Sequence, residues 1–251
     1  MYANRPEKIV ATIEARMTSS RLPGKVLLPI GGVPALEFMS RRLKRSSYLD
    51  AICVATTTNA QDDVLFALAE RLGVAYFRGS EEDVLGRVLA AARAAKADVI
   101  VELTGDCPFA DPELVDRGIE ELFSHDVDYA SNTLTPTYPN GFDVQMFPLA
   151  ILAEVAGLTN DPVDRAHASY YIYMHPEKYR CYNWKSDAAS FGPELRVTLD
   201  EDADYRALHD IARSMPDPLT ATAGDIVGYL RAHPEVVALN AHVRQKEAHE
   251  L

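Results

Sequence analysis

Hydrophobic and polar residues follow two different patterns along the first half of the chain. Short apolar runs, typical of buried strands, are separated by longer stretches in which apolar residues recur at helical spacing. These patterns predict strands over 8–15, 50–55, 74–77 and 98–103, and helices over 35–47, 60–72, 81–95 (with Ser80 as its N-cap) and from 112 onward. Strands that alternate with helices form right-handed βαβ units. We therefore expect an α/β fold with a parallel sheet covered by helices on both faces.

The second half of the chain is less regular. It predicts strands over 127–131, 142–147, 179–184 and 195–199 around a proline-rich loop, and helices over 161–175, 202–214 and 223–233. No repeat or flexible linker divides the two halves. The sequence therefore predicts one domain over residues 1–251, in which residues 127–195 elaborate the sheet into a mixed one.

Composition and charge exclude several functional classes. The 251 residues include 25 Lys and Arg against 37 Asp and Glu, a net charge of −12, so we do not expect a nucleic-acid or anionic-membrane binder. No apolar run is long enough to span a membrane, and the first residues lack the apolar core of a signal peptide. The three cysteines are far apart and form no CxxC pair. We expect a cytoplasmic protein.

The positive charge is concentrated at the start of the chain. Residues 1–45 hold nine cationic and three acidic side chains, a net charge of +6 in an otherwise acidic protein. Such a positive region suits a small polyanion. For the cations of the predicted helix, which are Arg41, Arg42, Lys44 and Arg45, we expect a solvated basic face.

The loop that follows the first strand carries the other cations. It reads Ala15-Arg-Met-Thr-Ser-Ser-Arg-Leu-Pro-Gly-Lys-Val26 and lies where open parallel sheets bind their ligands, beyond the carboxyl ends of the strands. Small hydroxyl residues and a glycine let backbone amides approach phosphate oxygens, and Arg16, Arg21 and Lys25 neutralise them. The loop matches neither a Walker A nor a GxGxxG motif. We interpret it as a phosphate-binding loop; the alternative is a surface loop with solvated arginines.

Two acidic segments follow predicted strands and are candidates for metal binding. Asp106 lies in Thr104-Gly-Asp-Cys-Pro108. In the second segment, Val197-Thr-Leu-Asp200-Glu-Asp-Ala-Asp204, one of the acids is a candidate second ligand and another a candidate N-cap of the next helix. Mg²⁺ takes only one or two protein carboxylates when a substrate supplies phosphate oxygens. Taken alone, Asp106 is more typical of a turn aspartate that caps the next helix. A cationic loop at the same sheet edge favours a metal site.

Several motifs together resemble a known family. They are the first loop, Ala55-Thr-Thr-Thr-Asn59, Phe77-Arg-Gly-Ser-Glu-Glu-Asp-Val-Leu-Gly-Arg87, Thr104-Gly-Asp-Cys-Pro108, Asn140-Gly-Phe-Asp-Val144 and Val197-Thr-Leu-Asp200. In this order they resemble cytidylyltransferases of the spore-coat polysaccharide biosynthesis protein F type, which are related to CMP-Kdo and CMP-sialate synthetases. The resemblance spans about residues 8–245. It implies a Rossmann-like nucleotide-diphospho-sugar transferase fold, with a mostly parallel mixed sheet flanked by helices.

The resemblance also implies roles for individual residues. The nucleoside triphosphate would be bound by Ala15, Arg16, Ser19, Ser20, Arg21 and Lys25. Arg78 and Asp83 would lie near the base and ribose; structural roles for these two are the alternative. Asp106 and Asp200 would hold Mg²⁺, and Arg16, Lys25 and Asp106 would be catalytic. Asp143 and His167 would contact the acceptor; a turn aspartate and a packed core histidine are the alternatives. Glu14 stands where the family usually has Gln.

The function implied is an Mg²⁺-dependent transfer of a nucleotidyl group from CTP to a sugar, with release of pyrophosphate. An acidic sugar for surface polysaccharide or glycan biosynthesis is the expected acceptor. Use of another triphosphate such as GTP on a sugar phosphate, a metal-dependent glycosyltransferase and a non-catalytic nucleotide-binding regulator stay open as alternatives. The sequence lacks the DxD motif typical of such glycosyltransferases. A homodimer is expected through the second half, where Tyr170, Tyr171, Tyr173 and Trp184 cluster.

Overall fold

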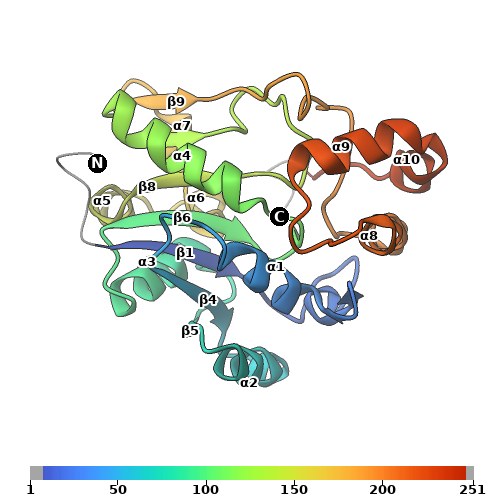
Figure 1. Cartoon of the computed structure of the whole chain (residues 1–251). Coiled ribbons are helices and arrows are strands. Elements are labelled where there is room, and N and C mark those ends of the chain that lie inside the picture. The colour runs from blue at the N-terminus through green and yellow to red at the C-terminus, as the bar shows by residue number, and fades with distance from the viewer. Residues whose placement is uncertain (1–7, 247–251) are drawn as a thin grey trace.

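The computed structural model describes residues 8–246, and a seven-stranded sheet lies at its centre (Figure 1). The strand order is β5-β4-β1-β6-β8-β7-β9. The sheet strands are β1 (Ile9–Glu14), β4 (Ala51–Thr57), β5 (Ala75–Gly79), β6 (Val99–Thr104), β7 (Tyr129–Ser131), β8 (Gln145–Pro148) and β9 (Cys181–Asn183), and a separate hairpin joins β2 (Pro29–Ile30) to β3 (Val33–Pro34). The first four sheet strands are parallel to one another; β8 is antiparallel to β6 and β7, and β7 is parallel to β9. The mostly parallel mixed sheet predicted from the sequence is confirmed.

Helices cover both faces of this sheet. They are α1 (Ala35–Leu43), α2 (Asp63–Leu72), α3 (Val84–Ala94), α4 (Pro112–His125), α5 (Leu149–Leu158), α6 (Pro162–Ala166), α7 (Tyr170–Met174), α8 (Asp202–Ser214), α9 (Ala223–Ala232) and α10 (Pro234–Asn240), with short 3₁₀ turns η1 (Lys25–Leu27) and η2 (Ala60–Asp62). Side chains of one strand alternate between the faces. Ile13 therefore packs with α1, α2 and α4 in one core, whereas Val10 packs with α3, α5 and α7 in the other.

The strands and helices predicted in the first half are present, apart from differences at their ends, but the short β2–β3 hairpin was not predicted. The predicted N-cap of α3 is wrong: the cap is Asp83, whose carboxylate accepts a hydrogen bond from the Gly86 N–H, and Ser80 instead accepts one from the Asp83 N–H in the preceding turn. The predicted helix 35–47 ends at Leu43. The structure adds α5 and α10, which the sequence analysis did not predict.

Two predicted elements of the second half are wrong. Residues 195–199 are extended but pair with loops: the Val197 N–H donates to the Asn140 carbonyl (2.7 Å) and the Leu199 N–H to the Asp106 carbonyl (2.7 Å). The predicted helix 161–175 is divided into α6 and α7. Between them the chain is extended at His167, buries Ala168 in the second core, and lets the Ser169 hydroxyl donate to the Gln145 side chain.

The expectation of a solvated basic face on α1 is wrong for Arg42. The Arg42 side chain is fully buried, and its guanidinium donates to the carbonyls of Phe109, Ala110, Pro218 and Ala221. Burial lowers the pKa of Arg42 to about 10, a value at which the group is still charged at neutral pH. Arg42 thus ties α1 to the start of α4 and to the segment before α9.

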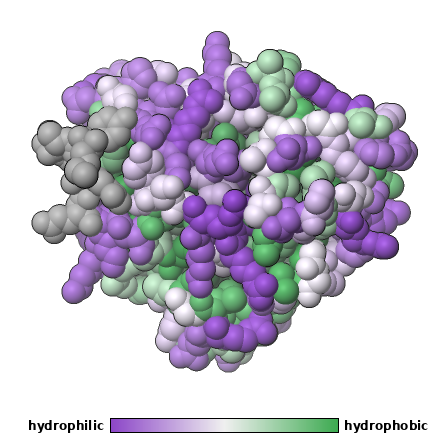
Figure 2. Space-filling view, viewed as in Figure 1, coloured by the Kyte–Doolittle hydropathy of each residue, from purple (hydrophilic) through white to green (hydrophobic). Residues whose placement is uncertain are grey.

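The surface in Figure 2 mixes hydrophilic and hydrophobic residues, with hydrophobic ones gathered in the lower part, where Figure 1 shows α1, α2 and β5. Among the residues that the structure describes, no helix has the length and apolar character needed to cross a membrane.

Candidate active site

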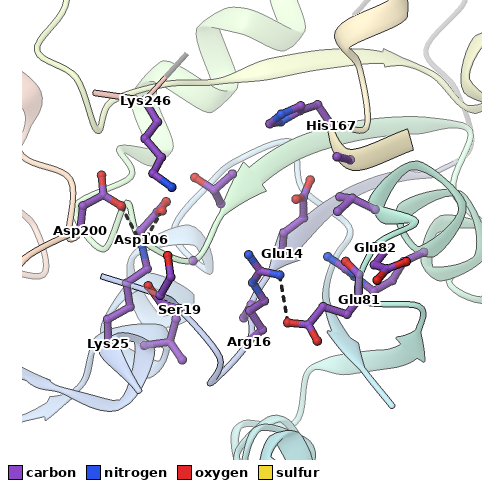
Figure 3. Close-up of a pocket in the computed structure, with 18 of the residues that line it drawn as sticks. Glu14, Arg16, Ser19, Lys25, Glu81, Glu82, Asp106, His167, Asp200 and Lys246 are labelled. Carbon is purple, nitrogen blue, oxygen red and sulfur yellow. Dashed lines mark hydrogen bonds and ion pairs between the residues drawn. The ribbon is translucent and has the colours of Figure 1, made fainter. Parts of the chain in front are cut away.

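A cavity of about 850 Å³ opens where β1 and β6 end (Figure 3). Most of the site residues predicted from the sequence line it, namely Ala15, Arg16, Ser19, Ser20, Arg21, Lys25, Asp83, Asp106, His167 and Asp200. Arg78 and Asp143 do not line it. The ligand site expected beyond the strand ends therefore coincides with a large cavity.

The first loop is folded back so that its cations face the cavity. The Met17 N–H donates to the Asp62 carboxylate (2.7 Å), and the Gly24 N–H donates to the Met17 carbonyl (2.9 Å). Gly24 has a φ of 72°, in the left-handed region, and a Cβ there would lie 3.2 Å from the Met17 methyl. Glycine at this position thus allows the tight turn that starts η1 and brings Lys25 toward β6.

Lys25 joins the two aspartates predicted to bind metal. Its Nζ donates to Asp106 at 2.8 Å and to Asp200 at 2.9 Å. Burial alone would lower the pKa of Lys25, but the two carboxylates outweigh it and raise that pKa above its ordinary value. Burial would raise the pKa of Asp106, and Lys25 instead holds it below the ordinary value. Lys25 and Asp106 are therefore charged together at neutral pH.

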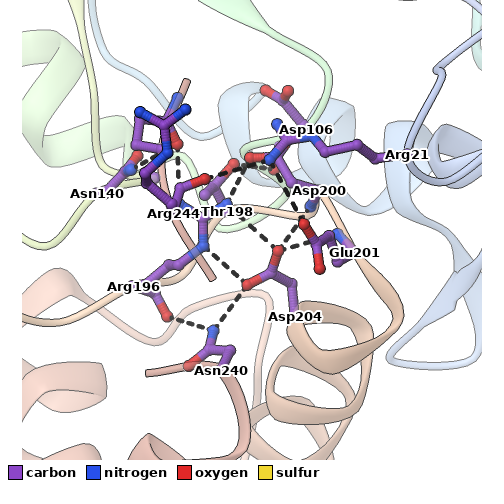
Figure 4. A network of polar contacts seen from close by, with 12 residues as sticks. Arg21, Asp106, Asn140, Arg196, Thr198, Asp200, Glu201, Asp204, Asn240 and Arg244 are labelled. Atoms are coloured by element: carbon purple, nitrogen blue, oxygen red, sulfur yellow. Dashed lines mark hydrogen bonds and ion pairs between the residues drawn. The ribbon is translucent and has the colours of Figure 1, made fainter. Parts of the chain in front are cut away.

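A network behind the cavity fixes Asp200 (Figure 4). The Arg196 guanidinium pairs with Asp200 at 2.5 Å and with Asp204 at 2.9 Å. Asp204 is fully buried and accepts hydrogen bonds from the backbone N–H groups of Asp200 and Glu201, both at 3.0 Å, as part of the capping box that starts α8. Asp200 is thus held by its own backbone as well as by its carboxylate.

The other end of the cavity is built around Glu81. Its carboxylate accepts hydrogen bonds from the hydroxyl of Thr18, from Asn59 (2.6 Å) and from Arg16 (3.0 Å). The Thr18 hydrogen bond, followed by those of Asn59 and Arg16, lowers the pKa of Glu81 below its ordinary value. This contact connects the first loop to the turn before α3.

Glu14, which lines the cavity, forms a carboxyl pair with Glu102 of the neighbouring strand. Glu14 and Glu102 project from neighbouring strands on the same face of the sheet, within hydrogen-bonding reach of each other. Burial, together with the neighbouring Glu102, raises the pKa of Glu14 well above its ordinary value, and burial raises that of Glu102 to about 7. One oxygen of each carboxyl has no hydrogen-bond partner within residues 8–246. A proton shared by the two groups accounts for both observations.

The residues predicted near the base and ribose have structural contacts. The Arg78 guanidinium donates to the Thr57 carbonyl (2.8 Å) and pairs with Asp63 (2.7 Å), which ties β5 to the start of α2. Asp83 caps α3 and pairs with Arg165, although it also borders the cavity. Arg78 lies away from the other predicted nucleotide-binding residues.

The two predicted acceptor residues lie in different places. His167 borders the cavity across from Glu14, on the extended stretch between α6 and α7 (Figure 3). Asp143 lies behind Asp106 and accepts a hydrogen bond from the Gly141 N–H (3.4 Å). Burial raises the pKa of Asp143 to about 6, and the negative charge of Asp106 adds to the shift.

Sequence reasoning missed several residues that line the cavity or fix it. Glu81 and Arg87 lie in the glycine-containing motif that carried the resemblance, so their position was an available signal. Arg196 and Asp200 are four positions apart, a spacing that indicates a contact in a helix. The segment was predicted to be extended, so this spacing gave no signal for the ion pair. Gln245 and Lys246 belong to no motif.

The residues present fit a magnesium ion bound together with phosphates. Asp106 and Asp200 are hard oxygen donors that converge on one cationic group, here the Lys25 ammonium. Among the described residues no cluster of three or more His, Cys, Asp or Glu side chains could hold a metal by itself. Two carboxylates suit Mg²⁺, which usually completes its octahedral shell with phosphate oxygens and water.

Comparison with known proteins assigns the chain to a class. The sequence model of the family described as Cytidylyltransferase matches residues 10–205. The chain is 34% identical over 234 residues to the spore coat polysaccharide biosynthesis protein SpsF of Bacillus subtilis, a match covering 90% of this chain and 95% of that protein. A cytidylyltransferase structure from Leptospira borgpetersenii is similar with a TM-score of 0.87 and 29% identity, over 96% of this chain and 99% of that one. The structure of a CMP:2-keto-3-deoxy-manno-octonic acid synthetase complexed with CTP shares the fold, with a TM-score of 0.64 and 19% identity over 83% of this chain and all of that one.

The fold is therefore that of the Rossmann-like nucleotidyltransferases, as the sequence predicted. Because the family match extends over most of its length, the chain belongs to the cytidylyltransferase family. It is a transferase of the type of SpsF and the CMP-Kdo synthetases, which confirms the resemblance and favours nucleotidyl over glycosyl transfer.

Proposed function

We propose that this cytidylyltransferase transfers CMP from CTP to an acidic sugar, releasing pyrophosphate, with Mg²⁺ as its cofactor, in the cytoplasmic synthesis of a surface polysaccharide or glycan. The observation that carries the proposal is the convergence of Asp106 and Asp200 on Lys25 beside the first loop. Two similar proteins support the same chemistry: SpsF is a spore coat polysaccharide biosynthesis protein, and the structurally similar CMP:2-keto-3-deoxy-manno-octonic acid synthetase binds CTP.

The charged residues at the end of the cavity that contains Lys25, Asp106 and Asp200 would bind the triphosphate. The sugar hydroxyl attacks the α-phosphorus in line, the bond to the bridging oxygen breaks, and pyrophosphate leaves. Arg21 and Lys25, together with Arg16 from the Glu81 end, would stabilise the negative charge that moves onto the leaving group. Positioning and electrostatics, rather than a covalent intermediate, supply most of the acceleration.

Asp106 and Asp200 would hold the magnesium ion, which when bound supplies positive charge to the phosphate oxygens. The Lys25 ammonium would then move from the two carboxylates to the phosphates, for which its flexible side chain is suited. Arg196 keeps Asp200 oriented during this exchange through its contacts with Asp200 and Asp204.

The acceptor would occupy the part of the cavity between Glu14 and His167. Arg87 and Arg165 also border this part, and their positive charge suits the carboxylate of an acidic sugar. Asp143 does not line the cavity but is close enough to Asp106 for that charge to act on it, and it would accept a hydrogen bond from an acceptor hydroxyl that reaches the Asp106 side.

A pyrophosphate-release screen tests the proposal. Each of the common nucleoside triphosphates is combined with acidic sugars, neutral sugars and sugar phosphates, with and without Mg²⁺. We expect release only with CTP, Mg²⁺ and an acidic sugar. Release with GTP and a sugar phosphate would support the alternative nucleotidyl transfer, and no release in any combination would contradict the proposed reaction.

A further inference from the structure

The segment after α10 forms part of the wall of the cavity. Gln245 and Lys246 line it together with Arg21, Lys25, Asp106 and Asp200. The segment lies beyond residues 10–205, which the family model matches, and the sequence analysis assigned it no role. In Figure 3 the Lys246 side chain extends toward Asp106 and Asp200 from the side opposite to Lys25.

Specific contacts hold this segment in place. The Gln245 side-chain oxygen accepts hydrogen bonds from Arg196 at 2.8 Å and from Asn140 at 2.9 Å. Arg196 is the residue that also pairs with Asp200 and Asp204 (Figure 4). The Arg21 guanidinium adds a longer contact of 3.5 Å to the Arg244 carbonyl. Gln245 is therefore hydrogen-bonded to the same network that fixes Asp200. Lys246 is the next residue in the chain after Gln245.

The charge balance of this end of the cavity indicates what Lys246 does. The cations Arg21, Lys25 and Arg196 pair with the carboxylates Asp106, Asp200 and Asp204, so these side chains bring no excess positive charge. A triphosphate is strongly anionic, and one Mg²⁺ compensates only part of its charge. Within residues 8–246 Lys246 has no hydrogen-bond or ion-pair partner, and it is exposed at the mouth of the cavity.

We propose that Lys246 is a further triphosphate-binding residue and that Gln245 positions it. Lys246 donates to the phosphate oxygens from the side of the cavity opposite to the first loop, so that the nucleotide is bound between two segments. The proposal rests on the function proposed above, since it requires that a nucleoside triphosphate bind in this cavity.

Calorimetry on the full chain with Mg²⁺ tests the proposal, using CTP, CMP and pyrophosphate as probes. Lys246→Ala is expected to weaken CTP binding about tenfold, the loss of one charge-assisted hydrogen bond, and to weaken pyrophosphate binding similarly. CMP lacks the outer phosphates and should bind the variant nearly as well as the wild type. Lys246→Arg should restore most of the CTP affinity, and Gln245→Ala should give a smaller loss than Lys246→Ala.

Lys185→Ala is the matched control, because Lys185 is exposed and does not line the cavity. It should leave all three affinities unchanged. Wild-type affinity for CTP in Lys246→Ala, while the wild type itself binds CTP, would overturn the inference and leave the proposed function intact. Absence of CTP binding in the wild type would instead contradict the proposed function.

Discussion

Asp106 and Asp200 are 94 positions apart in the chain, yet both carboxylates accept a hydrogen bond from Nζ of Lys25, at 2.8 and 2.9 Å. The first loop, the turn after β6 and the segment before α8 therefore meet at a single ammonium group. Two carboxylates this close repel each other unless a cation lies between them. In the free protein the cation is Lys25, and a metal ion that uses the same carboxylates has to displace it.

Replacing Lys25 by methionine should make the protein respond to Mg²⁺ alone. Lys25→Met leaves the two carboxylates without the ammonium between them, so Mg²⁺ no longer competes with a bound cation. We expect Mg²⁺ to raise the melting temperature of this variant by several degrees and that of the wild type much less. Differential scanning calorimetry over a magnesium titration measures the effect. The double variant Lys25→Met/Asp106→Asn is the control and should lose the response; equal responses of wild type and Lys25→Met would contradict the shared site.

Replacing Asp106 or Asp200 should abolish most of the activity, but the two replacements should lower the stability of the protein by different amounts. Asp106→Asn and Asp200→Asn should each lower the rate of pyrophosphate release by about a hundredfold or more. Asp200 is itself buried and also pairs with Arg21 and with the partly buried Arg196, so we expect urea unfolding to show a larger loss of stability for Asp200→Asn. Exposed Asp202 pairs with Arg206 on α8, and Asp202→Asn is the control. An inactive Asp202→Asn beside an active Asp200→Asn would show that the metal ligand is misassigned.

The sequence indicated where the site lies because its residues follow apolar strands. In a parallel sheet the carboxyl ends of neighbouring strands meet at one edge, so Arg16 after β1 and Asp106 after β6 were expected to be close. The motifs that carried the resemblance supplied Asp200. Its backbone environment was not predictable, because residues 195–199 alternate apolar and polar residues in the sequence as a strand does, while their partners are loops.

Contacts between distant segments could not be predicted for a related reason. Arg42 lies in a cluster of basic residues that is typical of a solvated helix face, and only the folded chain places four backbone carbonyls around it. Gln245 and Lys246 have no local pattern at all, and their position depends on Arg196 and Asn140. Periodicity encodes local structure and burial, whereas these contacts are set by tertiary packing.

The predicted homodimer can be tested by light scattering at micromolar concentration, where we expect twice the mass of the chain. Trp184 does not contribute to the predicted interface, because its side chain is buried in the core. Leu134, Leu158, Met174 and Phe191 support it: they are four of the six large exposed hydrophobic residues within 8–246, and all lie in the segment 127–195. Leu158→Asp combined with Met174→Asp should favour the monomer. Val64→Asp on α2 is the control and should leave the mass unchanged; a monomeric wild type would contradict the prediction.

Arg42 should be required for stability in a way that lysine cannot replace. Its planar guanidinium donates to carbonyls of two different segments, whereas a lysine ammonium is a point charge with fewer donors in a different geometry. We expect Arg42→Lys to lower the free energy of unfolding by about 3 kcal/mol, measured by urea denaturation, because buried carbonyls lose their donors. Exposed Arg93 on α3 provides the control, and Arg93→Lys should change the stability little. A nearly neutral Arg42→Lys would show that these hydrogen bonds contribute little.

The carboxyl pair Glu14 and Glu102 should make the stability of the free protein depend on pH. Burial raises the pKa of Glu102 to about 7, above the value of about 4.3 expected in the unfolded chain. A group whose pKa is raised on folding binds its proton more tightly in the native state, so its contribution is fully present below the unfolded pKa and is lost as the pH rises through the folded one. Stability should therefore fall between about pH 4.5 and pH 7.5 because of this pair.

Glu102→Gln removes the titrating group while keeping the shape of the side chain, and its amide can still donate to Glu14. Near pH 5 the variant and the wild type should be about equally stable, and at pH 8 the variant should be more stable by about 2 kcal/mol. Urea unfolding at a series of pH values, without Mg²⁺ or nucleotide, measures the difference. Glu194→Gln is the control, since Glu194 is exposed, and it should show no such divergence. A constant difference between Glu102→Gln and the wild type across this range would mean that the pair does not share a proton in the native state, and that both carboxyl groups are already ionised at pH 5.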